Sequence, residues 1–128
     1  AANESAWGTS RFARQANNLF GIWCYKPGCG LKPAKRNTGA KHEVRAYKTP
    51  FEGINGYVHN INTGHAYEHL REIRAEHRAN EAKPTGLHLV VGLTRYSERG
   101  EDYVEEIARM IRQNKLAAFL VDRAAQED

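Results

Sequence analysis

The sequence has little cysteine, little methionine and no long apolar run. Its 128 residues include two cysteines and one methionine, and no apolar stretch approaches the roughly 18 residues that a helix needs to cross a bilayer. The sequence therefore predicts no membrane span. Its length suits a single domain over residues 1–128 and leaves no room for two independent ones. Residue 1 is alanine, so we expect the chain to be the C-terminal part of a longer precursor whose targeting segment lies upstream.

Acidic residues are outnumbered by basic ones. Fifteen Asp and Glu stand against nineteen Lys and Arg, which gives a net charge of +4. A basic surface favours anionic partners such as nucleic acid, lipid head groups or cell-wall polymers, and an ordinary solvated surface explains the same balance. The basic stretch KPAKRNTGAKHEVR, residues 32–45, has no interleaved aromatic residues and no recognised nucleic-acid motif. We therefore expect no nucleic-acid partner.

The two cysteines stand close together in WCYKPGCG, residues 23–30. Pro27-Gly28 is a turn signal that folds the chain back and can bring the thiols of Cys24 and Cys29 together. A disulfide would favour an oxidising compartment. Two reduced thiols in a cytosolic protein are the alternative, and a zinc site would need two further ligands nearby.

Hydrophobic periodicity predicts a mainly helical domain of the α+β class with one small β-hairpin lobe. The expected elements are a mostly helical segment 1–17 interrupted near Gly8, an irregular loop 17–39, a strand 41–49 after a turn, and helices 50–61, 65–81, 87–93 and 97–115. The pattern of 87–93 also fits a strand. We expect the helix 50–61 to begin after a Thr49 cap and to bury Phe51, Ile54, Tyr57, Val58 and Ile61.

Glu4 is the first candidate for chemistry. A carboxyl group packed beside an indole and short of hydrogen-bond partners has its pKa raised by desolvation and can act as a general acid. Trp7 lies three residues further on, on the same face if the turn is helical. The alternative is a glutamate that only favours the helix dipole.

A second pattern, HAYEH over residues 65–69, competes with the first. His65 and His69 with Glu68 between them match the H-x-x-E-H pattern of inverted zinc metalloproteases. Zinc catalysis needs a third protein ligand from elsewhere, and the nearby candidates lie too close along the same helix to close the site. Exposed helical histidines are the favoured interpretation, and we expect no metal or other cofactor.

Longer stretches resemble a known family. ANESAWGTSRFARQANNLFGI, residues 2–22, looks like the signature of bacterial peptidoglycan hydrolases of the glucosaminidase family, glycoside hydrolase family seventy-three. VRAYKTPFEGINGYVHNIN, residues 44–62, is similar to the family's Arg-x-Tyr followed by a helix with an Asp-Tyr-like pair, and GHAYEHL resembles its Arg-Tyr-Ala segment. WCYKPGCGL and the stretch 92–116 are shared with Bax-type members.

The resemblance implies a lysozyme-like fold and cleavage of the β-1,4 bond after N-acetylglucosamine. It aligns Glu4 with the catalytic acid and Tyr67 with a tyrosine across the cleft. It also places four residues where relatives line or support the groove: Trp7, Asn18, Phe20 and Tyr47. Glu43 is the nearest candidate for the second carboxylate of flagellar relatives. The family's first helix is expected to be largely missing from this chain.

The resemblance implies an endo-β-N-acetylglucosaminidase of the periplasm or cell envelope whose partner is the peptidoglycan glycan strand. With one assigned carboxylate, the substrate's own 2-acetamido oxygen, assisted by Tyr67, can act as nucleophile; inversion with Glu43 activating a water is the other route. Two other classes stay open, an inactive wall-binding module and a zinc metalloprotease built on His65, Glu68 and His69.

Overall fold

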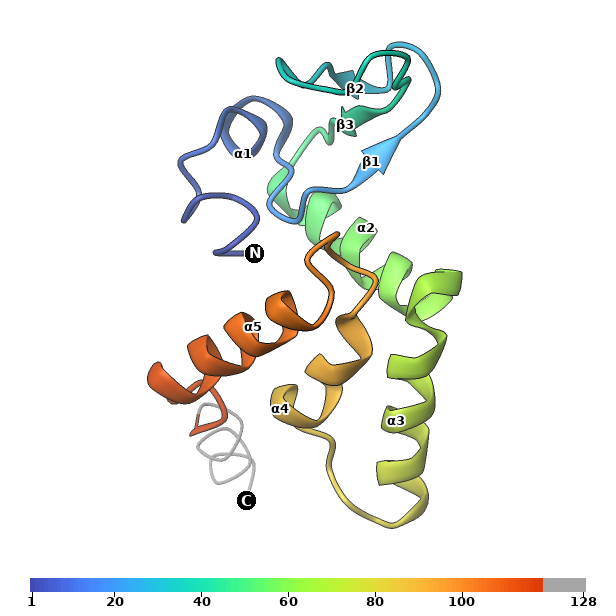
Figure 1. Cartoon of the computed structure of the whole chain (residues 1–128), viewed down its shortest axis with the longest axis vertical. Helices are drawn as coiled ribbons and strands as arrows, with labels where there is room; N and C mark the ends of the chain where they lie inside the picture. The colour runs from blue at the N-terminus through green and yellow to red at the C-terminus, as the bar shows by residue number, and fades with distance from the viewer. Residues whose placement is uncertain (119–128) are drawn as a thin grey trace. The chain divides into compact units, whose positions relative to one another are not determined.

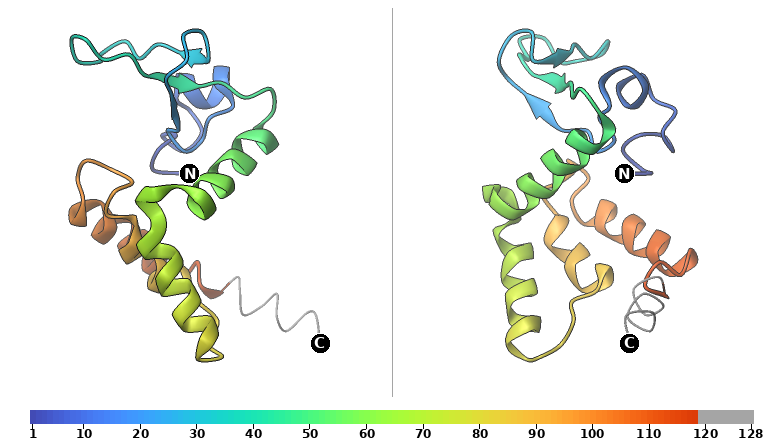
Figure 2. Two further views of the ribbon diagram at one scale, coloured as in Figure 1. Left: turned by 90° about the vertical axis from the view of Figure 1, so that its right-hand side faces the viewer. Right: turned by 180° about the vertical axis from the view of Figure 1, so that it is seen from behind.

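The computed structural model describes residues 1–118, in two compact units (Figures 1 and 2). The first unit runs from Ala1 to Asn60, and the second begins at Ile61. The predicted class is confirmed, because helices dominate and a single small antiparallel sheet accompanies them in the described residues. None of the described helices is long and apolar enough to pass through a membrane.

The first unit contains a short helix, the sheet and most of a long helix. These elements are α1 (Arg11–Ala16), β1 (Trp23–Cys24), β2 (Gly30–Leu31), β3 (Glu43–Arg45) and α2 (Pro50–Thr63), the last continuing into the second unit. The strands follow the order β1-β3-β2, and Val44 of the central strand pairs with Trp23 on one side and Leu31 on the other. The expected hairpin is thus a three-stranded sheet, and two of its strands come from the loop predicted to be irregular.

The first ten residues are not helical, which corrects the expectation of a mostly helical 1–17. Ala6, Trp7 and Gly8 have φ values of 49°, 57° and 81°, and three successive left-handed residues cannot continue a right-handed helix. The segment instead closes on itself through backbone bonds from Trp7 to Ala2 and from Ser10 to Ser5. Regular helix begins only at Arg11, after the Ser10 side chain caps the Ala13 N–H.

Helix α2 begins as predicted, with the Thr49 hydroxyl accepting the Glu52 N–H at 3.1 Å. Its expected buried face is partly wrong, since Phe51, Ile54 and Val58 are exposed. The reason is that this unit packs against the other side of the helix, where Gly53 is buried and where the ring of Tyr47 lies on Gly56.

The second unit is helical. It contains the 3₁₀ turn η1 (His65–Tyr67), α3 (Glu68–Ala79), α4 (Gly86–Leu89), the 3₁₀ turn η2 (Val90–Leu93) and α5 (Glu101–Gln113). The segment α4–η2 packs between α3 and α5 (Figures 1 and 2). The helix expected for 87–93 is confirmed as a short α-helix followed by a 3₁₀ turn, and the strand alternative is wrong. The core of this unit includes Leu70, Val90 and Tyr103.

Candidate functional site

Glu4 lies in the non-helical N-terminal turn, with most of its side chain covered. The side chain is 15% exposed, and the position that a Cβ would take on Gly21 is 3.9 Å from the Glu4 Cγ. Glycine suits this position because Gly21 has a φ of +67°. The Glu4 side chain therefore packs against the loop that follows α1, and one of its carboxylate oxygens lies 3.7 Å from the Ala1 amino group.

An aromatic stack belongs to the surroundings of Glu4. The rings of Phe20 and Tyr57 lie parallel with centroids 4.0 Å apart. The pKa of Tyr57 is raised, first by burial and then by the negative charge of Glu4. The structure thus brings together Glu4, Phe20 and Tyr57, which we call the acid–aromatic cluster. Sequence reasoning assigned Tyr57 only to the core of the helix 50–61.

Asn18 holds the loop that carries Phe20. It is buried, and its amide nitrogen donates to the carbonyl oxygens of Ile22 and Arg45 at 3.0 and 2.9 Å. Its side-chain oxygen accepts the N–H groups of Phe20 and Ile22, both at 3.2 Å. These four bonds use the full hydrogen-bonding capacity of the amide. Asn18 therefore supports the site from behind rather than offering a polar group to a ligand.

Tyr47 packs flat on α2. A Cβ on Gly56 would lie 2.6 Å from the Tyr47 hydroxyl oxygen, so only glycine permits this approach. The Tyr47 N–H donates to the Ala16 carbonyl at 2.8 Å, and burial raises the pKa of the Tyr47 phenol. Tyr47 thereby fixes the position of α2, which carries Tyr57, relative to α1.

Trp7 does not cover Glu4 as a helical turn would predict. Trp7 is 73% exposed. Its left-handed backbone conformation breaks the helical three-residue spacing that would align its side chain with that of Glu4. An exposed indole is available to a ligand. A role of Trp7 in shielding the Glu4 carboxyl group does not follow from this arrangement.

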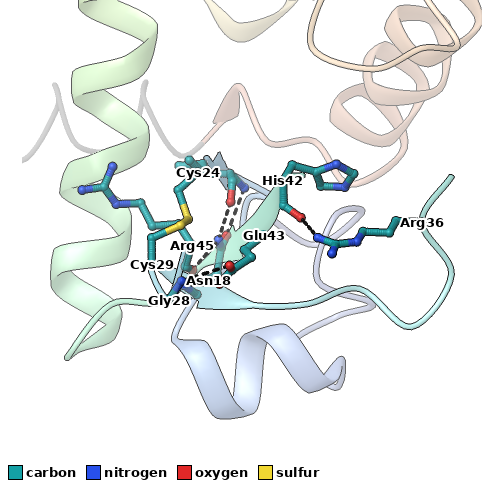
Figure 3. The surroundings of a disulfide bond; sticks show 10 residues. Asn18, Cys24, Gly28, Cys29, Arg36, His42, Glu43 and Arg45 are labelled. Carbon is teal, nitrogen blue, oxygen red and sulfur yellow. Dashed lines mark hydrogen bonds between the residues drawn. A yellow bond between two sulfur atoms is a disulfide. The ribbon is translucent and has the colours of Figure 1, made fainter. Parts of the chain in front are cut away.

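Cys24 and Cys29 form the expected disulfide (Figure 3). Glu43 lies beside it on β3, 4% exposed, and its two carboxylate oxygens accept the N–H groups of Gly28 and Gly30 at 3.0 and 3.1 Å. These two bonds, more than any other contact, hold the pKa of Glu43 below its usual value. Glu43 therefore fastens the disulfide-closed turn to the sheet.

Tyr67 is a core residue of the second unit. It is 7% exposed, and its ring lies 5.9 Å from that of Tyr96, which in turn stacks on Tyr103 at 5.8 Å. Tyr96 is the member of this group with intermediate exposure. A ligand approaching the three rings would reach Tyr96 before Tyr67.

His65 and His69 do not stand on one continuous helix, because α3 begins at Glu68 after the 3₁₀ turn. Each histidine is exposed and lies near an exposed glutamate, His65 with Glu68 at 3.8 Å and His69 with Glu72 at 3.7 Å. Within residues 1–118, no three His, Cys, Asp or Glu side chains gather in a way that could hold a metal ion. The geometry gives no support to the metalloprotease alternative.

A mostly covered carboxyl group beside stacked aromatic rings, in a mainly helical fold, is an arrangement suited to general acid chemistry on a sugar chain. Residues 1–116 match the glucosaminidase family, whose description is mannosyl-glycoprotein endo-beta-N-acetylglucosaminidase. The chain belongs to this family.

The chain is also similar to the protein bax of Escherichia coli (strain K12), at 36% identity over 118 residues. The similarity covers 90% of this chain and 40% of the relative, so the chain spans less than half the length of that protein. No solved structure matches the chain.

Proposed function

We propose that this domain is an endo-β-N-acetylglucosaminidase that cleaves peptidoglycan glycan strands with Glu4 as the general acid. The observation that carries the proposal is the position of Glu4 within the acid–aromatic cluster. Its side chain is 15% exposed and lies against Gly21, and its negative charge helps to raise the pKa of Tyr57. Family membership supplies the class of reaction.

In this proposal the Glu4 carboxyl group donates its proton to the glycosidic oxygen as the bond from that oxygen to C1 breaks. The 2-acetamido oxygen of the same sugar bonds to C1 and forms a cyclic intermediate. Water then adds at C1, opens the ring and returns a proton to the Glu4 carboxylate. The reaction is a net hydrolysis that leaves a reducing N-acetylglucosamine end.

The burial of Glu43 favours this substrate-assisted route over inversion. A general base must reach a water molecule beside the sugar, whereas both oxygens of Glu43 are engaged by Gly28 and Gly30. We therefore propose that Glu43 maintains the sheet and that the substrate provides the nucleophile.

The burial of Tyr67 also bears on its expected role in assisting the substrate's 2-acetamido group. Tyr67 is buried, so we propose that it supports Tyr96, whose intermediate exposure allows contact with a sugar. Among the groove positions implied by the resemblance, we propose Trp7 and Phe20 as contacts and Asn18 and Tyr47 as supports.

Because the proposed substrate is the cell wall, we propose that the domain acts outside the cytoplasm, in the periplasm or cell envelope. The Cys24–Cys29 disulfide is compatible with such an oxidising compartment. The proposal is tested by incubating the domain with purified peptidoglycan and measuring new reducing ends. Their appearance supports hydrolysis. Sedimentation with the peptidoglycan without new ends would instead identify an inactive wall-binding module.

A further inference from the structure

The sheet of the first unit carries a concentration of positive charge. Residues 22–48 contain one acid, Glu43, and seven basic residues: Lys26, Lys32, Lys35, Arg36, Lys41, Arg45 and Lys48. The resulting +6 exceeds the net charge of the whole chain, +4. Glu43 is buried and accepts hydrogen bonds from two backbone N–H groups. All of the basic residues except Arg36 are exposed. This surface therefore attracts anions.

A flat aromatic surface lies within this basic region. The indole of Trp23 and the imidazole of His42 are stacked, with centroids 3.7 Å apart and planes at 12°. We call this pair the Trp23–His42 plate. Trp23 is 48% exposed, although an indole side chain is large and hydrophobic and is favourable to bury. A flat, half-exposed ring of this kind can receive the apolar face of a sugar, burying C–H groups on both sides.

A cation is fixed to the backbone of His42, one of the two residues of the plate. The Arg36 guanidinium donates to the His42 carbonyl oxygen at 2.7 Å (Figure 3). Arg36 and Lys32 also lie close enough to Glu43 for their charges to help lower its pKa. The buried Glu43 and its two bonds to the disulfide turn thus hold the plate-bearing strands and these cations in one place.

We propose that the Trp23–His42 plate and its surrounding cations form a binding site for carboxylated glycan, in which a sugar ring packs on Trp23 and carboxylates of the attached peptides pair with Arg36 and its neighbours. The proposal rests on the proposed function for the identity of the polymer. It adds Trp23 and His42, which are not members of the acid–aromatic cluster, as a contact surface for the glycan.

The rival ligand is single-stranded nucleic acid, which also combines stacking with phosphate binding. The glycan is favoured because one plate without further stacked rings offers a single stacking position. Two large aromatic residues of the segment 22–48 are exposed, Trp23 and Tyr25. Of these two, Trp23 is the one that stacks on His42.

The test measures binding without cleavage, in the Glu4→Gln background. Sedimentation with purified peptidoglycan is compared between Trp23→Ala and a control, Phe51→Ala, which removes an exposed aromatic ring from α2 (69% exposed, against 48% for Trp23). Loss of a central aromatic contact is expected to weaken binding about 10-fold, and the control is expected to bind as the parent does. Circular dichroism verifies that each variant is folded.

Charge is tested in the same assay. Arg36→Gln combined with Lys41→Gln is expected to weaken binding to peptidoglycan and to reduce its dependence on salt, whereas Arg78→Gln with Lys83→Gln, in the second unit, changes neither. Chitin, an uncharged polymer of N-acetylglucosamine, is expected to bind more weakly than peptidoglycan.

Three results would overturn the proposal: unchanged binding in Trp23→Ala, equal binding to chitin and peptidoglycan, or displacement of peptidoglycan by an oligothymidylate at lower concentration than by soluble peptidoglycan fragments. Failure of the proposed function is distinguishable, since it appears as absent cleavage by the wild-type chain while the binding differences persist. Conversely, if the wild-type chain cleaves peptidoglycan and Trp23→Ala binds it normally, the proposed binding site is refuted while the proposed enzymatic function stands.

Discussion

The negative charge of Glu4 helps to raise the pKa of the Tyr57 phenol, although 52 residues lie between them in the sequence. Helix α2 presents Tyr57, and the N-terminal turn presents Glu4. Phe20, stacked on Tyr57, comes from a third segment that Asn18 ties to β3. The candidate site of the first unit is therefore assembled from distant segments, each held by its own backbone bonds.

The Glu4–Tyr57 relationship predicts a linked titration. Replacing Glu4 by Gln removes a negative charge that opposes ionisation of the phenol, so the pKa of Tyr57 should fall toward the ordinary tyrosine value while remaining raised by burial. The measurement is a pH titration of ¹³C-labelled tyrosine by NMR, with Tyr57→Phe identifying the signal. An identical Tyr57 titration in both proteins would show that the two groups do not interact.

Gly56 is predicted to be intolerant of a side chain. In Gly56→Ala the new Cβ meets the Tyr47 hydroxyl, and such overpacking costs about 1–3 kcal/mol, offset in part by the gain of about 1 kcal/mol in helix propensity. We expect a net loss of stability in urea unfolding. The neighbouring exposed residue supplies the control: Asn55→Ala should not destabilise α2. Equal stability of the two variants would contradict the close packing of Tyr47.

Glu43 is predicted to make stability depend on pH. Its pKa is lowered from 4.5 in the folded protein, chiefly by the Gly28 and Gly30 N–H groups. The stabilisation is therefore present above pH 4.5 and is lost as the pH falls through the lower, folded-state pKa. In Glu43→Gln we expect a lower Tm at neutral pH and a smaller fall in Tm on acidification. Parallel curves for the two proteins would refute this role.

The tyrosines of the second unit are predicted to differ in function. Tyr96→Phe should reduce kcat more than Tyr67→Phe, because Tyr67 is buried and Tyr96 is partly exposed. Both variants retain the ring that packs in the group. Steady-state hydrolysis of soluble peptidoglycan fragments compares them, and a larger loss in Tyr67→Phe would return the assisting role to Tyr67.

Local sequence signals predicted much of this fold. The Thr49 cap, the Pro27-Gly28 turn and the amphipathic pattern of α5 are all local in the sequence, and each gives the expected local structure. The left-handed residues at Ala6 and Trp7 could not be foreseen, since neither residue favours that conformation.

Tertiary packing explains the other differences. The apolar stripe of α2 predicts a buried face that the structure exposes, because the pattern does not reveal that Tyr47 packs on the glycines of the opposite side. For the candidate site, motif resemblance proposed Glu4 and Phe20, and this proposal stays a prediction. The stack of Phe20 on Tyr57 and the stack of Trp23 on His42 join segments far apart in the chain. Such adjacency requires a structure.

The central claim is tested most directly by the chemistry of the cut. Purified peptidoglycan is digested with the wild-type domain and with a folded Glu4→Gln variant, the products are reduced with borohydride, and mass spectrometry identifies the sugar alcohol. We predict reduced N-acetylglucosamine ends from the wild type and none from the variant. Reduced muramic acid ends, no new ends from the wild type, or undiminished cleavage by Glu4→Gln would contradict the account.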